Sequence, residues 1–266
     1  MSSENSGTAS AIITGGAGGI GEALAVLLRD AGYAVVLADV DTRRGPEVAD
    51  RVGATFAHAD VRDQPSLEAA VATAEALGPV RAAFLNAGAA AGMTSVEDVP
   101  LEVYRRVLAI NVDGTFLGIR AAAPAIRRAG GGAIVATASL AGVAAWPGDP
   151  VYVASKHAVV GLIQAAAPGL AAEGIRVAAV CPGFVDTPMV PAAFRDTGFP
   201  LLSSGEVAGA LLDAARDAEP GELRLVQPGL GSLRYQPRSV PAARANDGSK
   251  PPVPTSAGRT TAESGG

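Results

Sequence analysis

A short apolar run, a glycine-rich turn and a helical pattern follow one another near the start of the chain. Residues 11–14 (A-I-I-T) are apolar and β-branched, as in a buried strand. Residues 14–21 read T-G-G-A-G-G-I-G, and helical periodicity follows. Glycines let a backbone approach a pyrophosphate, and the first turn of a helix offers free N–H groups. This order predicts a dinucleotide site at Gly15, Gly19, Ile20 and Gly21, and a turn without a ligand is the alternative.

A carboxylate ends the second predicted strand, residues 33–39. From that position Asp39 can hydrogen-bond the adenosine ribose hydroxyls and repel a 2′-phosphate. The position therefore predicts NAD as the cofactor. An ordinary loop or capping acid is the alternative interpretation of Asp39, and Asp41 competes with it. Arg43 and Arg44 keep NADP as the second choice.

Strand and helix patterns alternate along most of the chain. Further strands are predicted at residues 54–58, 80–85, 133–138, 175–181 and 222–226, with helices between them. This alternation indicates the α/β class, as a single Rossmann-type doubly wound parallel sheet of about seven strands with helices on both faces. Ligands of such sheets bind beyond the carboxyl ends of the strands. The residues flagged near those ends are Asp39, Asp60, Asn86, Ser139, Tyr152 and Pro182.

Composition divides the chain and limits its partners. Of the 266 residues, 48% are hydrophobic, which is enough for one large domain at residues 11–230. Residues 1–10 form a polar tail, and residues 231–266, rich in Pro, Gly, Ser and Thr, are predicted to be disordered. The net charge of −5 argues against nucleic acid as a partner. With one cysteine, no metal-ligand spacing, no signal pattern and no membrane-spanning run, a cytoplasmic protein without a metal is expected.

Tyr152 and Lys156 lie four residues apart, on one face of a predicted helix. A phenol has a pKa of about 10, and an ammonium group one turn away favours the phenolate and lowers that pKa. The pair therefore predicts an acid–base device that works near neutral pH. Because Tyr-x-x-x-Lys also occurs by chance on amphipathic helices, the pair is informative only beside the other residues at the same sheet edge.

These residues together resemble the short-chain dehydrogenase/reductase family over residues 11–229. The segments that carry the resemblance are T-G-x-x-x-G-x-G at 14–21, N-A-G at 86–88, Y-x-x-x-K at 152–156 and P-G-x-V-x-T at 182–187. The resemblance implies hydride transfer to or from a nicotinamide cofactor. The cofactor-binding residues that it implies are Gly15, Gly19, Ile20, Gly21, Asp39, Asp60, Val61, Asn86, Ala87, Gly88, Tyr152, Lys156, Pro182, Gly183, Val185 and Thr187.

The resemblance also implies a catalytic tetrad of Asn111, Ser139, Tyr152 and Lys156. Tyr152 would be the general base in alcohol oxidation and the acid in the reverse direction, and Lys156 would lower its pKa and hold the nicotinamide ribose. Ser139 would hydrogen-bond the substrate oxygen, and Asn111 would anchor a water between Lys156 and solvent. A homodimer or homotetramer is implied as well, and Pro168 is expected to kink or end the helix that usually forms its interface.

The predicted function is NAD(H)-dependent interconversion of a hydrophobic secondary alcohol and its ketone. The small-molecule substrate would contact an apolar wall, although such residues also serve simply to pack loops. Three alternatives remain: an NAD-binding regulatory or scaffold module without turnover, an NADP(H)-preferring ketoreductase, and a sugar-nucleotide epimerase or dehydratase. The wall residues are Val143, Trp146, Phe184, Met189 and Val190.

Overall fold

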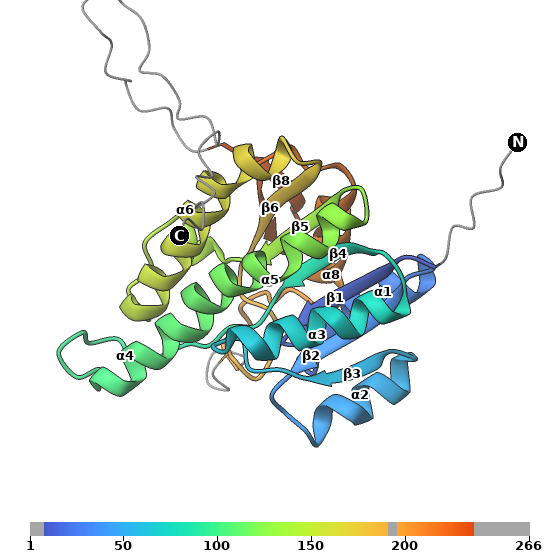
Figure 1. Ribbon diagram of the computed structural model, residues 1–266. Coiled ribbons are helices and arrows are strands. Elements are labelled where there is room, and N and C mark those ends of the chain that lie inside the picture. Colours follow the sequence, from blue (N-terminus) through green and yellow to red (C-terminus); the bar gives the residue numbers. More distant parts are fainter. Residues whose placement is uncertain (1–7, 191–195, 237–266) are drawn as a thin grey trace, which may run out of the picture. The chain divides into compact units, whose positions relative to one another are not determined.

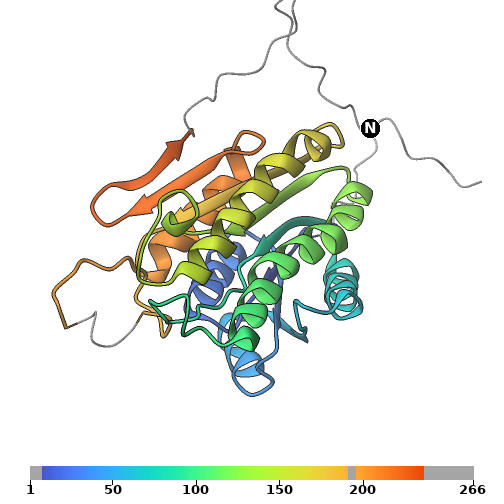
Figure 2. The same ribbon diagram turned by 90° about the vertical axis from the view of Figure 1, so that its left-hand side faces the viewer.

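The computed structural model describes residues 8–190 and 196–236, and its core is an eight-stranded sheet between two layers of helices (Figure 1, Figure 2). Each predicted strand is present within one residue of its expected ends. The strands are β1 (Ser10–Thr14), β2 (Ala34–Asp39), β3 (Thr55–His58), β4 (Val80–Leu85), β5 (Gly132–Thr137), β6 (Ile175–Pro182), β7 (Leu223–Gln227) and β8 (Gly231–Tyr235).

The helices of the described residues cover both faces of this sheet. They are α1 (Gly19–Asp30), α2 (Arg44–Val52), α3 (Gln64–Leu77), α4 (Leu101–Leu108), the π-helix η1 (Ala109–Asp113), α5 (Gly114–Arg128), the 3₁₀ turn η2 (Leu140–Gly142), α6 (Pro150–Ala171) and α8 (Ser204–Asp217). Buried side chains of α3, α5 and α6 form one apolar core with the sheet, and those of α1, α2 and α8 form a second core on the opposite face. Strands buried on both sides explain why their sequences are apolar throughout and do not alternate.

The strand order is β3-β2-β1-β4-β5-β6-β7-β8, and all pairs are parallel except β7 with β8. The chain reverses its direction of winding between β1 and β4. Connections leave these two strands toward opposite sides, and in sheets of this kind the ligand crevice lies beyond the carboxyl ends of such strands. The doubly wound α/β fold predicted from the sequence is therefore confirmed, and it places the flagged residues at one edge.

Residues 101–128 form one continuous helical segment that is not uniform. Helices α4 and α5 are joined through η1, whose wider turn contains Asn111. Single-turn π segments inserted in a helix are rare and are found mostly at functional sites. Asn111 is 1% exposed, so the irregular turn places a polar side chain inside the protein.

Pro168 lies inside α6, and the helix runs on to Ala171 before it ends. A proline lacks only its own N–H and crowds the carbonyl four residues earlier, so near the end of a helix few bonds are at stake. Pro168 was expected to kink or end the helix that carries Tyr152. The helix instead ends at Ala171, about one turn after the proline.

Strand β8 corrects the predicted domain boundary. The sequence analysis assigned every residue after 230 to a disordered tail, whereas Gly231–Tyr235 pairs antiparallel with β7 along its whole length. The turn between the two strands uses Gly229 at φ +74° and Gly231 at φ +67°, a backbone region that favours glycine. The folded unit therefore extends to Tyr235. The remainder of the predicted tail, residues 237–266, and residues 1–7 lie outside the described residues.

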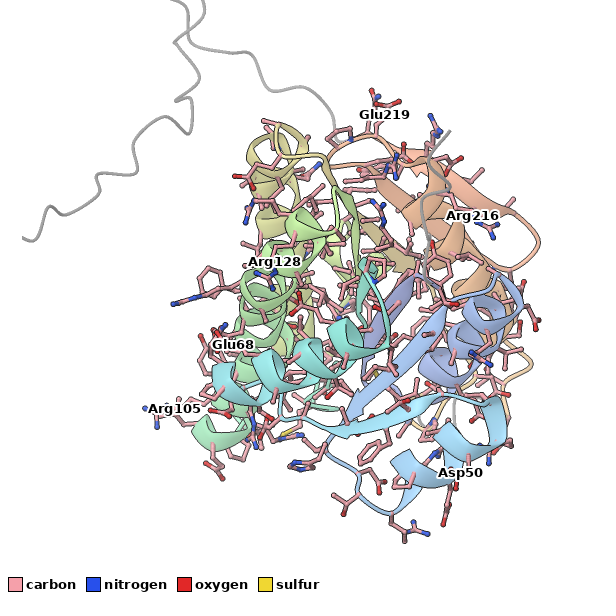
Figure 3. All side chains as sticks on the ribbon, turned by 45° about the vertical axis from the view of Figure 1, so that its right-hand side comes forward. Asp50, Glu68, Arg105, Arg128, Arg216 and Glu219 are labelled. Atoms are coloured by element: carbon pink, nitrogen blue, oxygen red, sulfur yellow. The ribbon has the colours of Figure 1, made fainter. Side chains whose placement is uncertain are left out.

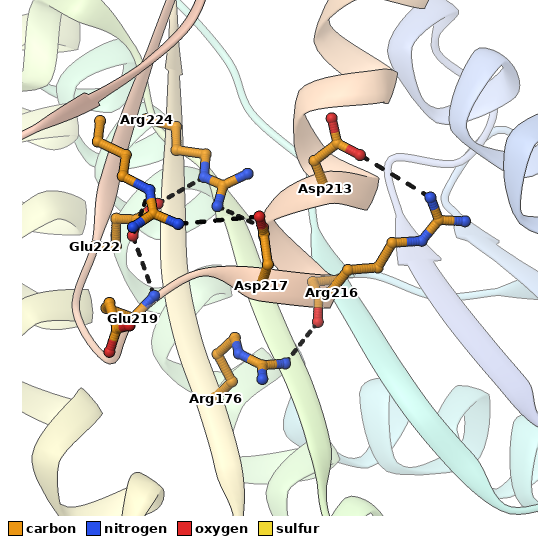
Figure 4. Close-up of polar contacts among 9 residues, drawn as sticks. Arg176, Asp213, Arg216, Asp217, Glu219, Glu222 and Arg224 are labelled. Atoms are coloured by element: carbon orange, nitrogen blue, oxygen red, sulfur yellow. Dashed lines mark hydrogen bonds and ion pairs between the residues drawn. The ribbon is translucent and has the colours of Figure 1, made fainter.

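Ion pairs hold this sheet edge together (Figure 4). The guanidinium of Arg224, 5% exposed, contacts Glu222 at 2.7 Å and Asp217 at 2.6 Å. Arg234 of β8 reaches the same two carboxylates, at 3.5 Å from Glu222 and 3.9 Å from Asp217. Figure 3 shows exposed charged side chains that point outward at Asp50, Glu68, Arg105, Arg128, Arg216 and Glu219.

Candidate active site

Three strand ends meet at the carboxyl edge of the sheet through Asn86. The Thr14 hydroxyl oxygen at the end of β1 accepts hydrogen bonds from the backbone N–H groups of Asn86 (3.0 Å) and Ala87 (3.2 Å). The Asn86 amide donates to the Gly15 carbonyl at 3.2 Å, and its oxygen accepts from the Thr137 hydroxyl of β5 at 3.0 Å. The Asn-Ala-Gly motif thus joins β1, β4 and β5 and fixes the floor of the crevice.

The glycine-rich turn is packed too closely for side chains. A Cβ on Gly16 would lie 2.7 Å from the Leu37 Cβ, and one on Gly21 would lie 2.6 Å from the Gly15 carbonyl oxygen. Gly15 has φ +65°. Within the described residues no side chain caps the start of α1, so the turn suits a bound pyrophosphate. Ile20 follows in the first turn of α1 and packs against the core below it.

We expect Gly21→Ala to abolish dinucleotide binding. The added methyl would meet backbone atoms, the Gly15 oxygen at 2.6 Å and the Gly16 Cα at 2.8 Å, so the turn must open. NADH titration by fluorescence should show affinity weakened at least about tenfold, and unfolding should show a loss of about 1–3 kcal/mol. Gly161→Ala, on the exposed face of α6 with nothing within 4 Å, is the matched control. It should bind NADH normally and gain up to about 1 kcal/mol. Normal NADH affinity in Gly21→Ala would contradict this assignment of the turn.

Asp39 lies against this turn, at the end of β2. One carboxylate oxygen accepts from the Ala17 N–H at 2.9 Å, and the other accepts from the Asp41 N–H at 3.0 Å. The competing residue Asp41 is turned toward its own loop, where it accepts from the N–H groups of Arg43 and Arg44. These bonds, above all the one from Arg44, lower the pKa of Asp41. Of the two acids, Asp39 is therefore the one beside the glycine turn.

The segment after β6 reaches the same turn from the other side. Pro182 ends β6, Gly183 N–H bonds the Val226 carbonyl, and Val185 forms a bridge with Leu202. A Cβ on Gly19 would lie 3.8 Å from the Thr187 methyl and 2.9 Å from the Ser204 hydroxyl. Residues 182–187 thus face the start of α1. Ser204, at the start of α8, is a neighbour of the turn that the sequence analysis missed.

Asp60 and Val61 follow β3 at the far side of the crevice. The Asp60 carboxylate binds the Arg62 guanidinium at 2.6 Å, which holds the pKa of Asp60 below its usual value. Val61 packs against Gly114, where an added Cβ would lie 2.9 Å from it. Both residues lie at a strand end as predicted, and their contact with an adenine base stays a prediction.

Ser139, Tyr152 and Lys156 come together between β5, η2 and α6. The Lys156 ammonium donates to the Thr137 carbonyl at 2.7 Å and lies 5.6 Å from the centre of the Tyr152 ring. Lys156 is 4% exposed. Ser139 accepts from the Ala141 N–H at 3.1 Å, so its hydroxyl is held at the mouth of β5.

Burial is the main cause of the pKa shifts of Tyr152 and Lys156. Desolvation raises the pKa of Tyr152 to about 12, against a smaller lowering by the hydrogen bond with Ser139. Burial also lowers the pKa of Lys156 to about 8. The sequence analysis expected Lys156 to lower the pKa of Tyr152. In the protein alone the pKa of Tyr152 is raised instead, because burial removes water from the phenolate.

The Asn111 side chain is committed to backbone and helix contacts. Its oxygen accepts from the Ala89 N–H at 2.7 Å, and its amide donates to the Ala89 carbonyl and the Ser155 hydroxyl, both at 2.8 Å. A Cβ on Gly88 would lie 3.5 Å from both the Asn111 oxygen and the Lys156 nitrogen. Asn111 is therefore beside Lys156, as expected, and its role as a water anchor stays a prediction.

Asp149 is a site residue that the sequence analysis missed. It is 2% exposed and caps α6 immediately before Pro150. An acid followed by proline at a helix start is a recognisable capping signal. The signal was available in the sequence, but nothing there indicated that the carboxylate would also reach the segment after β4.

The predicted apolar wall is assembled in part. Trp146 and Phe184 meet edge to face with ring centres 5.4 Å apart, and Phe184 meets Phe199 in the same way at 5.6 Å. Phe199 was not predicted. Val143 packs against the sheet core and Val190 is 8% exposed, whereas Met189 is 47% exposed. The aromatic cluster Trp146, Phe184 and Phe199 therefore joins the loop before α6 to the loop after β6.

Three further observations concern metal ligands, membrane-spanning helices and the single cysteine. In the described part of the chain, no group of three His, Cys, Asp or Glu side chains is placed to bind a metal ion. Within the same residues, no helix is long and apolar enough to cross a membrane. Cys181, at the end of β6, is buried, and desolvation raises the pKa of its thiol to about 12.

Comparison with known proteins agrees with this geometry. Residues 9–198 match the family model described as short chain dehydrogenase. The chain is 39% identical to cyclohexanol dehydrogenase of Acinetobacter sp. (strain SE19), over 68% of this chain and 74% of that protein. It is 36% identical to the mitochondrial borneol dehydrogenase of Lavandula x intermedia, over 78% of this chain and 83% of that protein.

A solved structure extends the likeness to three dimensions. The 3-ketoacyl-(acyl-carrier-protein) reductase of Brucella melitensis, solved in complex with NADH, superposes with a TM-score of 0.78 at 29% identity. The superposition covers 84% of this chain and 98% of that one. With the matched family model and the alcohol dehydrogenases above, the crevice, the glycine turn and the Tyr152–Lys156 pair identify this chain as a member of the short-chain dehydrogenase/reductase family, an NAD(P)-dependent oxidoreductase acting on CH–OH groups.

Proposed function

We propose that the protein uses NAD(H) to interconvert a hydrophobic secondary alcohol and its ketone. The observation that carries the proposal is the meeting of two groups at one sheet edge. Tyr152, Ser139 and the buried Lys156 lie beyond β5, and the Asp39 carboxylate lies against the glycine turn beyond β1 and β2. The first group can move a proton, and the second can hold a dinucleotide.

Each residue has a role that its contacts support. In alcohol oxidation Tyr152 takes the hydroxyl proton, and Ser139 hydrogen-bonds the same oxygen as it becomes a carbonyl. Lys156, held by the Thr137 carbonyl, keeps a positive charge near the phenol and donates to the nicotinamide ribose. Asn111 fixes Ala89 and Ser155 around Lys156. In this proposal it would also anchor the water of the proton relay. The bound nicotinamide supplies the hydride acceptor and, in its oxidised form, a positive charge that favours the phenolate.

The aromatic cluster favours a ring-bearing, apolar substrate. Trp146, Phe184 and Phe199 present ring edges and faces, which suit alicyclic or aryl groups. Two similar proteins are named for cyclohexanol and borneol, both cyclic secondary alcohols. The direct test is an activity screen over cyclic and aryl secondary alcohols, and over the matching ketones. Turnover of linear primary alcohols only would contradict this substrate class.

NAD should be preferred over NADP because the Asp39 carboxylate would repel a 2′-phosphate. Arg44, the basic alternative, lies 4.0 Å from Glu22. We expect kcat/KM at least about tenfold higher with NADH than with NADPH, and a smaller ratio in Asp39→Asn. Asp41→Asn, which changes the neighbouring acid, should leave the ratio unchanged. A preference for NADPH in the wild type would instead assign the 2′-phosphate to Arg43 or Arg44.

A homodimer or homotetramer belongs to the same proposal. Leu101, Tyr104 and Phe116, along α4 and α5, expose 40–55% of their surface, which supports a covered face between copies. A module that binds NAD without turnover is the weaker alternative, because it has no chemical need for Ser139, Tyr152 and Lys156 together.

A further inference from the structure

We propose that Asp149 is a positioning residue for the reaction, which holds residues 91 and 92 against the first turn of the helix that carries Tyr152. The inference rests on the proposed function. It assigns to Asp149 a task that none of the four predicted catalytic residues performs. That task is to set the separation between the segment that leaves β4 and the start of α6.

The two oxygens of Asp149 make different contacts. Oδ1 accepts from the Tyr152 N–H at 2.9 Å, which is the ordinary bond of a helix N-cap. Oδ2 accepts from the N–H groups of Ala91 at 2.8 Å and Gly92 at 2.7 Å. Three backbone donors therefore converge on one carboxylate, and two of them belong to a segment nearly 60 residues away in the sequence.

Besides a 3.5 Å contact from the Arg106 guanidinium to the Ala90 carbonyl, the same segment is fixed at two other points. At its start, Asn86 and Ala87 donate to the Thr14 hydroxyl oxygen. At its middle, both backbone groups of Ala89 bond the Asn111 amide, and Gly88 faces Lys156. Asp149 provides the third attachment. Residues 86–92 run beside the catalytic lysine, so losing the third attachment would let this wall move relative to Tyr152.

Helix capping alone does not account for an aspartate here. Serine and threonine cap helices about as well, and they do so without the cost of burying a carboxylate. Asp63 provides the comparison within the chain. It caps α3 by accepting from the Ser66 N–H at 2.9 Å, it is also followed closely by a proline, and it is exposed. Of these two capping aspartates, Asp149 is the one that is buried and that also bonds a second segment.

The charge of Asp149 also reaches Tyr152. Burial is the main cause of the raised pKa of Tyr152, and the negative charge of Asp149 adds to it, as does that of Cys181 once its thiol ionises. The hydrogen bond with Ser139 acts in the opposite direction, and Lys156 is the cation beside the ring. Because a negative charge disfavours a phenolate, removing Asp149 should shift the acid limb of the kcat profile to lower pH.

The test is Asp149→Ser, which keeps a helix cap and loses the contact with residues 91 and 92. We expect kcat for alcohol oxidation to fall at least about tenfold with a smaller change in KM. The acid limb should move to lower pH, and amide exchange at Ala91 and Gly92 should quicken at least about tenfold. Asp63→Ser is the matched control and should leave all three quantities unchanged.

Two outcomes would overturn the inference. One is a Tm loss in Asp149→Ser with unchanged kcat and pH profile, which is the signature of a purely structural cap. The other is unchanged exchange at Ala91 and Gly92. If Asp149→Ser does not fold, Asp149→Asn, which has the same volume, is read in the same way. If the wild type turns over no alcohol, the proposed function fails, and amide exchange and NADH affinity still test the attachment.

Discussion

Tyr152→Phe is expected to lower kcat about 10²- to 10⁴-fold while NADH affinity stays unchanged. The substitution removes only the hydroxyl that exchanges a proton with the substrate and leaves the ring in place. Tyr152 lies beside Ser139 and Lys156, and burial disfavours its phenolate. Steady-state oxidation of a cyclic secondary alcohol, with NADH titration in parallel, measures both quantities.

The control for this variant is Tyr104→Phe on α4, which removes a hydroxyl from an exposed tyrosine outside the site. Its turnover should equal that of the wild type. Near-normal kcat in Tyr152→Phe would remove the proton-transfer role and with it the proposed mechanism. The folded pKa of Tyr152 lies near 12, above its ordinary value of 10. Its contribution to the free energy of unfolding is therefore fully present below pH 10 and is lost as the pH rises through 12.

Lys156→Met is expected to abolish turnover and to make the protein more stable at neutral pH. Burial lowers the pKa of Lys156 from 10.5 to about 8, so holding the ammonium in the folded state costs about 3 kcal/mol at pH 7. The lost hydrogen bond to Thr137 returns about 1 kcal/mol of that. The net gain in unfolding free energy should be about 2 kcal/mol, with kcat lower by at least about 100-fold.

The pH dependence makes this prediction specific. Between about pH 8 and 10.5 the folded wild type has lost the Lys156 proton and the unfolded chain has kept it. The unfolded state then binds more protons, so wild-type stability rises with pH and the advantage of Lys156→Met disappears. Urea unfolding at pH 7 and pH 10 measures the change. Arg105→Met, which removes an exposed cation, should show no such change. A Lys156→Met protein that is less stable at pH 7 would contradict the cost assigned to burial.

The sheet was predictable because its signal is local. Runs such as residues 11–14 and 80–85 are apolar and bounded by glycine or proline, and they appear as β1 and β4 at the expected positions. Strand β8 was not predictable in this way. Its five residues include a glycine, a serine and an arginine, and it is held by pairing with β7 and by the contacts of Arg234 with Glu222 and Asp217. Those partners lie outside the five residues of the strand, so the residue pattern of the strand does not reveal them.

Long-range contacts also account for the site residues that were missed. Phe199 and Ser204 join the site only because the chain after β6 folds back, placing Ser204 beside Gly19 and Phe199 beside Phe184. Asp149 carries a visible capping signal, yet its second oxygen finds Ala91 and Gly92 through the packing of α6 against the β4 segment. No pattern within a short window describes such a contact.

The sequence by itself determined the α/β class, the order of the strands along the chain and the edge at which the Gly15 turn, Asp39, Ser139, Tyr152 and Lys156 meet. Hydrophobic periodicity and motif spacing are local properties, and parallel strands bring their carboxyl ends together. Only the tertiary structure decided the ionisation of Tyr152 and Lys156 and the second role of Asp149. Burial and convergent backbone donors arise when distant segments pack. Burial raises the pKa of Tyr152, whereas helical spacing alone predicted that Lys156 would lower it.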